Sequence, residues 1–274
     1  MKDTTSSVFH HCKTAVITGA SSGIGLEYAR QLAARKIDVI LLARRKDKLE
    51  EICLNLSNTH DISASFIPVN LSNIDEVQNV CQEILKKSPI DILINCAGFA
   101  TRGEFTSVSL ETHFQMISLH VNSAVALCHS ILPTMQTQNR GIIINVASIG
   151  AFTPTQDNSI YSATKSFLVA FSQNLNVELE GTNIIVQAVC PGFTKTEFHH
   201  VGHFSDFDAS VIPERLWMSA TDVVSTSLAK LKKNKVILIP GFKNRLFLRL
   251  HRTFLVQLYI KSRRKKALEK SQLK

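Results

Sequence analysis

The sequence lacks any cysteine arrangement that would indicate a metal site or a redox motif. No two of its six cysteines form a C-x-x-C pair, and they stand far apart in the chain: Cys12, Cys53, Cys81, Cys96, Cys128 and Cys190. Zinc sites need ligands at short, regular spacing, so no metal is expected. His199, His200 and His203 have no carboxylate or cysteine at ligand spacing and are interpreted as exposed loop residues. The cysteines are interpreted as reduced thiols of a cytoplasmic protein.

The sequence also lacks a long apolar run and, outside its C-terminal end, an excess of positive charge. No stretch of about 18 apolar residues occurs, so no transmembrane helix is expected. Residues 1–12 are polar and contain no signal-peptide core. Residues 243–274 carry eleven Lys and Arg against one acid, Glu269, hence +10, whereas residues 1–242 carry −1 of the total of +9. A nearly neutral body argues against nucleic acid as a partner.

Short apolar segments alternate with amphipathic ones along the body of the chain. Uninterrupted apolar runs such as Ile142-Ile143-Ile144 are typical of strands buried on both faces. The alternation predicts an α/β fold, a doubly wound parallel sheet of about seven strands with helices on both faces. Strands are expected at 14–18, 39–43, 64–69, 90–95, 141–147, 184–190 and 235–239. Helices are expected at 24–35, 47–56, 74–87, 110–135, 159–180 and 221–232.

No linker divides the chain, so we expect three parts in sequence. A flexible N-terminal segment comprises residues 1–12, one catalytic domain spans 13–242, and a basic amphipathic extension covers 243–274. A chain of 274 residues with 45% apolar content is long enough for one large α/β domain with a sizeable core.

Tyr161 and Lys165 stand four residues apart in a predicted helix, so both side chains lie on one helix face. Ser148 ends the fifth predicted strand, at the edge where open parallel sheets bind ligands. A cation beside a phenol favours the phenolate and lowers a pKa that is otherwise about 10. The three residues therefore predict a site in which Tyr161 transfers a proton near neutral pH.

A glycine-rich turn, TGASSGIG at residues 18–25, joins the first predicted strand to the first helix. Its glycines would allow the backbone to approach a pyrophosphate, whose charge faces the helix N-terminus. The turn favours dinucleotide binding, with a tight turn without a ligand as the alternative. No Gly-Lys-Ser/Thr ends it, which excludes a P-loop. The cofactor contacts expected from this turn are Gly19, Ser21, Ser22, Gly23, Ile24 and Gly25.

In this order the motifs resemble those of the short-chain dehydrogenase/reductase family over roughly residues 13–240. Residues 161–165 match its Tyr-x-x-x-Lys, and 95–98 are similar to its Asn-Ala-Gly segment, with Cys96 as a departure. Asn122 matches the asparagine of its long helix. The resemblance implies a Rossmann-type fold and, through the long helices, a homo-oligomer, dimer or tetramer.

The resemblance also implies the role of each catalytic residue. Tyr161 protonates the carbonyl oxygen, and Ser148 fixes that oxygen by a hydrogen bond. Lys165 binds the nicotinamide ribose and lowers the pKa of Tyr161, while Asn122 holds a water that connects Lys165 to solvent. Besides Tyr161 and Lys165, the further cofactor contacts implied are Asn70, Leu71, Asn95, Ala97, Gly98, Pro191, Gly192, Thr194 and Thr196.

The end of the second predicted strand reads Ala43-Arg44-Arg45 and has no acid for a ribose 2′-hydroxyl. Two guanidinium groups suit a 2′-phosphate instead. NADP(H) is therefore the expected cofactor, held mainly by Arg44 with help from Arg45 or Ser21. The alternative is that both arginines are solvated residues at a helix start.

Two segments leave alternatives open. Residues 193–220 contain aromatic and apolar side chains that suit an apolar carbonyl substrate or simply pack the loop. They are Phe193, Phe198, Phe204, Phe207, Trp217 and Met218. In the tail, apolar residues at near-helical spacing alternate with arginines, so it can lie on an anionic membrane or pack on its own domain or a subunit. These residues are Phe247, Leu250, Phe254 and Leu258.

The sequence therefore predicts an NADP(H)-dependent oxidoreductase that reduces an apolar ketone, of 3-oxoacyl or steroid-like type. That substrate class is an analogy with similar ketoacyl and steroid reductases. Two rival interpretations stay open: a catalytically silent NADP-binding regulatory protein of the same fold, and a peripheral membrane protein that acts through its tail. Replacing Tyr161 with Phe separates the first rival from an enzyme, because only an enzyme would lose its function.

Overall fold

The computed structural model describes residues 8–87, 89–154, 156–199, 212–232 and 235–251. Within these residues, seven strands form a parallel sheet in the order β3-β2-β1-β4-β5-β6-β9. The predicted doubly wound sheet of Rossmann type is thus confirmed. The strands are β1 (Thr14–Thr18), β2 (Asp38–Ala43), β3 (Ala64–Pro68), β4 (Ile92–Asn95), β5 (Gly141–Val146), β6 (Ile184–Val189) and β9 (Ile237–Leu238). The order reverses between β1 and β4, and ligands of such sheets bind at that switch point.

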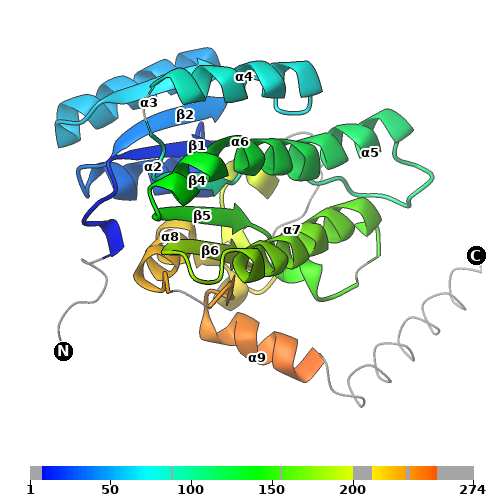
Figure 1. Ribbon diagram of the computed structural model, residues 1–274. Helices are drawn as coiled ribbons and strands as arrows, with labels where there is room; N and C mark the ends of the chain where they lie inside the picture. Colours follow the sequence, from blue (N-terminus) through cyan, green and yellow to red (C-terminus); the bar gives the residue numbers. More distant parts are fainter. Residues whose placement is uncertain (1–7, 88, 155, 200–211, 233–234, 252–274) are drawn as a thin grey trace, which may run out of the picture.

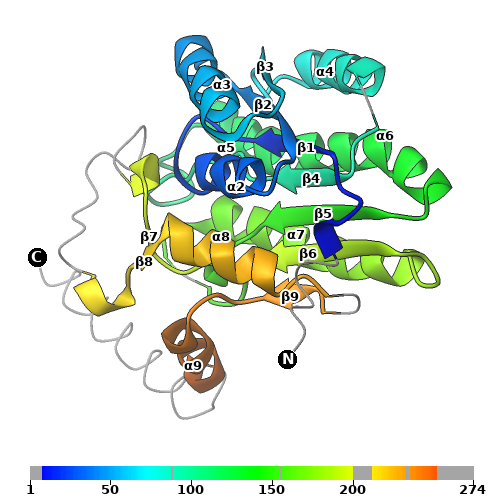
Figure 2. The ribbon, with the colours of Figure 1, turned by 90° about the vertical axis from the view of Figure 1, so that its left-hand side faces the viewer.

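Helices cover both faces of the sheet (Figures 1 and 2). On one face lie α4 (Ile74–Lys87), α6 (Ser123–Thr137) and α7 (Ser159–Glu178). On the other lie α2 (Gly23–Ala33), α3 (Lys46–His60) and α8 (Ala220–Ala229). Every residue of β1, β4 and β5 is buried, because a parallel strand covered on both faces has no solvent side.

The long helix that the sequence predicts at 110–135 is divided in three. It consists of α5 (Leu110–Ile117), a π-helical turn η1 (Ser118–Asn122) and α6. A π-helical turn inserts a residue into the helix and shifts the direction of the side chains that follow, often at a functional site. The sequence pattern gives no sign of this turn, because the apolar periodicity continues through it.

The same helical run, Leu110–Thr137, is long and apolar enough to cross a membrane by length and composition, with a mean hydropathy of 1.3. Its α6 part packs against α4, β4 and β5, with Leu127, Ile131 and Met135 buried. We therefore attribute its apolar content to the core of the domain.

Smaller differences from the prediction occur in the last elements of the chain, after β6, and at its N-terminus. A two-stranded sheet of β7 (Thr194–Lys195) and β8 (Met218–Ser219) was not expected, and β9 is shorter than the predicted strand at 235–239. After β9, the helix α9 (Phe242–His251) lies at the edge of the domain (Figure 2). From Val8 on, the predicted flexible segment 1–12 packs against the core.

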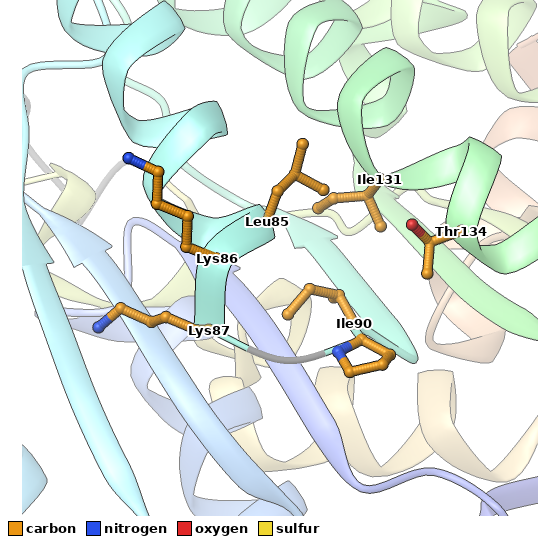
Figure 3. A pocket seen from close by; sticks show the side chains of 7 residues that line it. Leu85, Lys86, Lys87, Ile90, Ile131 and Thr134 are labelled. Carbon is orange, nitrogen blue, oxygen red and sulfur yellow. The ribbon is translucent and has the colours of Figure 1, made fainter.

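A small cavity of about 160 Å³ lies between α4 and α6 (Figure 3). Leu85 from α4 and Ile131 from α6 lie on either side of it, and Ile90 lies just before the start of β4. The cavity is therefore at the amino-terminal edge of the sheet. The predicted catalytic residues follow the carboxyl ends of the strands, so this cavity is not their substrate site.

Candidate active site

Ser148, Tyr161 and Lys165 meet at the carboxyl end of β5. Ser148 begins the short 3₁₀ turn η2 (Ile149–Ala151), where its Oγ accepts a hydrogen bond from the Gly150 N–H at 3.1 Å. Tyr161 is hydrogen-bonded to the Ser148 side chain from the first turn of α7. The Lys165 Nζ lies 5.8 Å from the centroid of the Tyr161 ring and donates to the Val146 carbonyl at 2.9 Å. The structure thus brings three of the four predicted catalytic residues together.

Burial dominates the electrostatics of these groups. It raises the pKa of Tyr161, and the hydrogen bond from Ser148 lowers that pKa only in part. Burial also lowers the pKa of Lys165 to about 8, against the opposing effect of the Cys96 and Cys190 thiols. The net shift of the Tyr161 pKa is therefore upward in this structure, because loss of water around the phenol outweighs the hydrogen bond with Ser148.

The glycine turn has no room for a side chain at two of its positions and little room at a third. A Cβ on Gly19, whose φ is +66°, would lie 2.8 Å from the Cα of Ala97. A Cβ on Gly25 would lie 2.5 Å from the Gly19 carbonyl oxygen, and one on Gly23 would lie 3.1 Å from Thr196. The turn ends at the N-terminus of α2, where backbone N–H groups favour an anion. The geometry fits the pyrophosphate of a dinucleotide.

Thr18 holds the predicted Asn95–Gly98 segment against this turn. Its Oγ1 accepts hydrogen bonds from the N–H groups of Cys96 and Ala97, both at 2.9 Å. Asn95 is buried and donates to Asn145 Oδ1 at 2.8 Å, which ties β4 to β5. Thr18 was not among the predicted site residues; its place as the last residue of β1 and the first of the glycine turn is the signal that could have identified it.

The two arginines after β2 differ in placement. Arg45 reaches the glycine turn, where its Nη2 donates to Ser21 Oγ at 2.9 Å and to the Ser21 carbonyl at 3.2 Å. Its Nη1 also pairs with Glu197 Oε2 at 2.8 Å. Arg44, which the sequence favoured, is exposed. The structure therefore brings Arg45 to the glycine turn, and it adds Glu197, which the sequence did not indicate.

The remaining predicted cofactor residues follow β3 and β6. After β3, Leu71 is buried and Asn70 is exposed. After β6, the Pro191 carbonyl accepts from the Ile149 N–H at 3.0 Å, which places this loop beside the turn that carries Ser148. Thr194 Oγ1 donates to the Gly192 carbonyl at 3.0 Å, and Thr196 lies against Gly23, as described above.

Within the described residues, the Asn122 side chain is not hydrogen-bonded to Ser148, Tyr161 or Lys165, and its role of holding a water stays a prediction. Asn122 is exposed at the end of the π-helical turn, and its Nδ2 donates to Ser118 Oγ at 3.4 Å. His120, two residues earlier, lies in the centre instead, with 1% of its surface exposed and its ring centroid 5.9 Å from that of Tyr161. The match of Asn122 to a family motif could not show which residue the π turn directs inward.

The described part of the 193–220 segment places one aromatic ring beside Tyr161 and packs two others against each other. The Phe198 ring centroid lies 6.2 Å from that of Tyr161, and the rings of Phe193 and Trp217 lie 5.5 Å apart. Phe204, Phe207, His200 and His203 lie outside the residues that the structure describes. Within the described residues, no group of three or more His, Cys, Asp or Glu could hold a metal ion.

Comparisons with known proteins agree with this geometry. The family model for short chain dehydrogenase matches residues 13–202. Hydroxysteroid dehydrogenase-like protein 1 of Gallus gallus is 36% identical over 179 residues, which are 65% of this chain and only 54% of that protein. The NADP-dependent 3-hydroxy acid dehydrogenase of Schizosaccharomyces pombe is 34% identical over 197 residues, 71% of this chain and 76% of that protein.

Among solved structures, a short-chain dehydrogenase from Sphingobium yanoikuyae in complex with NADPH superposes with a TM-score of 0.78. It is 29% identical, and the match covers 94% of this chain and 95% of that one. The family model includes the glycine turn as well as Ser148, Tyr161 and Lys165, so the likeness extends to the residues that would carry chemistry. Because that model spans most of the domain, this chain belongs to the short-chain dehydrogenase family of oxidoreductases.

Proposed function

We propose that this protein is an NADP(H)-dependent oxidoreductase that reduces the carbonyl group of an apolar ketone to a secondary alcohol. The observation that carries the proposal is the meeting of Ser148, Tyr161 and buried Lys165 beside a glycine turn at the carboxyl edge of the sheet. NADPH, when bound, supplies the hydride. The protein's own residues must then bind the carbonyl oxygen and deliver a proton to it.

Tyr161 is suited to give that proton. Since burial raises its pKa, the phenol is protonated at neutral pH, which is the state a proton donor needs. Ser148, hydrogen-bonded to Tyr161, offers a second hydroxyl to the same carbonyl oxygen and fixes its position. Lys165, with its pKa lowered to about 8, can return a proton to Tyr161 after each turnover. Each residue thus acts on one oxygen atom or on the proton that this oxygen receives.

NADP(H) fits the residues around this centre. The turn at 18–25 would bind the pyrophosphate, and Arg45 and Ser21 would bind the phosphate on the adenosine ribose, with Arg44 as a second cation. Lys165 would bind the nicotinamide ribose. The relatives support this choice, because one is named for NADP and one was solved with NADPH. The other residues proposed to contact the cofactor are Asn70, Leu71, Asn95, Ala97, Gly98, Pro191, Gly192, Thr194 and Thr196.

An apolar substrate is supported by the aromatic side chains of the 193–220 segment. Phe198 lies beside Tyr161, and Phe193, directly after Pro191 and Gly192, packs with Trp217. The names of relatives point the same way: besides the steroid-dehydrogenase-like and 3-hydroxy acid proteins, a ketoacyl reductase HetN of Nostoc is 31% identical over 225 residues. A 3-oxoacyl or steroid-like ketone is therefore the proposed substrate class.

The test is NADPH oxidation, followed by absorbance, against a panel of 3-oxoacyl and steroid ketones. NADH and a Tyr161→Phe variant serve as controls. We expect turnover with NADPH that the variant loses by about 100-fold or more, since a proton donor contributes roughly 10²–10⁴-fold. Turnover that survives in the variant would refute the role of Tyr161. Tight NADPH binding without turnover on any ketone would favour the silent regulatory protein.

We also propose a homo-oligomer, dimer or tetramer, formed through α5, α6 and α7. Three large apolar side chains on these helices face solvent: Phe114 is 58% exposed, Phe167 38% and Val125 37%. Exposed apolar side chains that cluster on packed helices are typical of a subunit interface. Light scattering after size exclusion should show an oligomer for the wild type and a monomer for a Phe114→Lys, Phe167→Lys double variant. A monomeric wild type would refute the proposal.

For the tail we propose peripheral contact between α9 and the anionic surface of a membrane, with the protein otherwise cytoplasmic. Phe242 is 69% exposed and Phe247 48%, and the exposed Arg245 and Arg249 lie between and beyond them. Apolar and cationic side chains on one short helix suit a surface of anionic lipid. A second copy of this chain is a poorer partner, because residues 243–274 carry +10 and would repel each other.

Vesicle sedimentation tests the tail, with vesicles of phosphatidylcholine alone and with added phosphatidylserine. We expect binding to the anionic vesicles only, and its loss in a Phe242→Ser, Phe247→Ser variant. Point variants are better here than deletion of 243–274, since Leu248 of α9 is buried against the domain and its removal would disturb the fold. Equal sedimentation of wild type and variant would rule α9 out.

A further inference from the structure

His120 stands at the centre of a line of hydrogen bonds between two parts of the catalytic site. Its Nε2 lies 3.1 Å from the Phe99 N–H, in the turn that follows β4, and its Nδ1 lies 2.8 Å from Thr164 Oγ1 on α7. A backbone N–H can only donate, so Nε2 is the accepting nitrogen and Nδ1 carries the proton. Thr164 Oγ1 in turn donates to the backbone carbonyl of Tyr161 at 2.8 Å.

This imidazole is held in its neutral form. Burial and the nearby Lys165 ammonium lower the pKa of His120 well below its usual value. A Cβ on Gly98 would lie 2.8 Å from the His120 Nε2 and 3.5 Å from the Lys165 Nζ, so both nitrogens border the same small space. A proton on Nε2 would break the bond to Phe99 and put a second cation beside Lys165. His120 therefore acts here as a fixed donor and acceptor of hydrogen bonds.

We propose that His120 is a positioning residue of this catalytic centre. It fixes the turn after β4 to the first turns of α7, and so sets the distance between the Tyr161 hydroxyl and a bound substrate. Asn122, at the exposed end of the π turn, donates instead to Ser118 Oγ. This inference rests on the proposed reductase activity.

Three variants test it: His120→Leu, His120→Asn and, as the matched control, His129→Leu. We expect kcat to fall by about 100-fold in His120→Leu, the effect of a misplacement of about 1 Å. His120→Asn should recover part of that loss, since an amide can accept from Phe99 and donate toward Thr164. His129→Leu should stay within about twofold of the wild type, because this histidine is exposed on α6.

Binding measurements separate positioning from loss of fold. Adenosine 2′,5′-bisphosphate contacts only the adenosine half of the cofactor site, so its Kd should be unchanged in His120→Leu, while the Kd of NADPH should rise as the nicotinamide half is disturbed. Full activity in His120→Leu, or an equal loss in His129→Leu, would overturn the inference. If the wild type reduces no ketone, the proposed activity fails, and the two Kd values alone decide the role of His120.

A separate group of charges lies where Arg45 meets the glycine turn. Glu197 follows β7, and its carboxylate pairs with Arg45 at 2.8 Å and with Lys48 at 3.2 Å. Its hydrogen bonds to Arg45 and Lys48 lower the pKa of Glu197, so it is anionic at neutral pH. A guanidinium, an ammonium and the Ser21 hydroxyl are donors that also suit a phosphate group.

We propose that Glu197 is an internal competitor for the phosphate on the adenosine ribose of NADP(H), and that it reduces the affinity of the protein for this cofactor. A phosphate that binds Arg45 and Lys48 must displace the Glu197 carboxylate from both. The Thr194–Glu197 segment, which lies against Gly23 through Thr196, would then be released from the end of β2. This second inference rests on the proposed choice of NADP(H).

The competition is tested by a comparison of Glu197→Gln with the wild type. Both proteins are titrated calorimetrically with adenosine 2′,5′-bisphosphate and with adenosine 5′-monophosphate at one fixed salt concentration. We expect the Kd of the bisphosphate to fall by roughly three- to tenfold, the range for two exposed ion pairs, and the Kd of the monophosphate to stay the same. Glu214→Gln is the matched control, since Glu214 pairs with Lys195 on the same segment and does not contact Arg45. An unchanged or higher Kd in Glu197→Gln would overturn the inference. A wild type that does not bind the bisphosphate would refute the cofactor choice itself.

Discussion

Replacing Lys165 with Met should make the protein without cofactor more stable and inactive at the same time. The lysine is 5% exposed, and burial lowers its pKa from 10.5 to about 8. Below about pH 8, Lys165 is charged in both the folded and the unfolded state, and the buried charge then lowers the free energy of unfolding by its full amount. At about 1.36 kcal/mol per pKa unit this cost is about 3 kcal/mol near pH 7.

The sign of the pH dependence follows from the lowered pKa. As pH rises from about 8 to about 10.5, folded Lys165 loses its proton first, and the cost falls to zero. Near pH 9.5 about 1 kcal/mol remains, so the stability advantage of the Met variant should shrink by about 2 kcal/mol between pH 7 and pH 9.5. Burial raises the pKa values of Cys96 and Cys190 to about 12, so these neighbouring thiols stay protonated in this range.

Urea denaturation of both proteins at the two pH values measures this change. Loss of the hydrogen bond to the Val146 carbonyl costs the variant about 1 kcal/mol, so we expect a net gain of about 2 kcal/mol near pH 7 and close to none near pH 9.5. Replacing Lys230, an exposed lysine, with Met should give no such pH-dependent difference. A Lys165→Met advantage that stays constant with pH would refute the reasoning, because only the titration of Lys165 produces the slope.

Two further substitutions separate the two edges of the sheet. Gly19→Ala should lower the free energy of unfolding by at least about 1–2 kcal/mol, because Gly19 has a φ of +66° and its Cβ would lie 2.8 Å from Ala97. The variant should also lose affinity for NADPH. Unaltered NADPH binding in a titration would argue against the turn as the binding site of the cofactor. Asp91→Ala should lower the free energy of unfolding, measured by urea denaturation, by about 2 kcal/mol, because buried Asp91 accepts from the Lys13 N–H at 2.7 Å and from Arg140 Nε at 3.3 Å. The affinity for NADPH should not change. A large change in that affinity would contradict the position of Asp91 at the edge of the sheet opposite the site.

The sequence predicted the positions of the strands and their parallel arrangement well, because both depend on features that a linear pattern records. Uninterrupted apolar runs such as Ile142-Ile143-Ile144 indicate burial on both faces, and alternation with helices fixes parallel pairing. Ser148, Tyr161 and Lys165 were also identifiable, because a strand end and helical i, i+4 spacing place them at one edge. Such local rules require no knowledge of distant contacts.

The interactions that the sequence did not reveal depend on distant contacts or on a broken local rule. Glu197 meets Arg45 across 152 positions in the chain, and no spacing rule links two charges so far apart. The π turn at 118–122 breaks the 3.6-residue period without a Gly or Pro to mark it, so helical periodicity cannot tell His120 from Asn122 as the inward residue. Burial of Tyr161 reverses the pKa shift that its neighbour Lys165 alone would suggest.

Several features of the site share one physical property. The carboxyl edge of the sheet collects features that each cost stability: a buried ammonium, glycines at positive φ and a π-helical turn. A chain selected only for stability would replace Lys165 and straighten the helix at 118–122, because nothing in the fold alone requires either. Their presence together at one edge therefore argues that this edge performs the chemistry, and it predicts that substitutions which stabilise the protein there will reduce its activity.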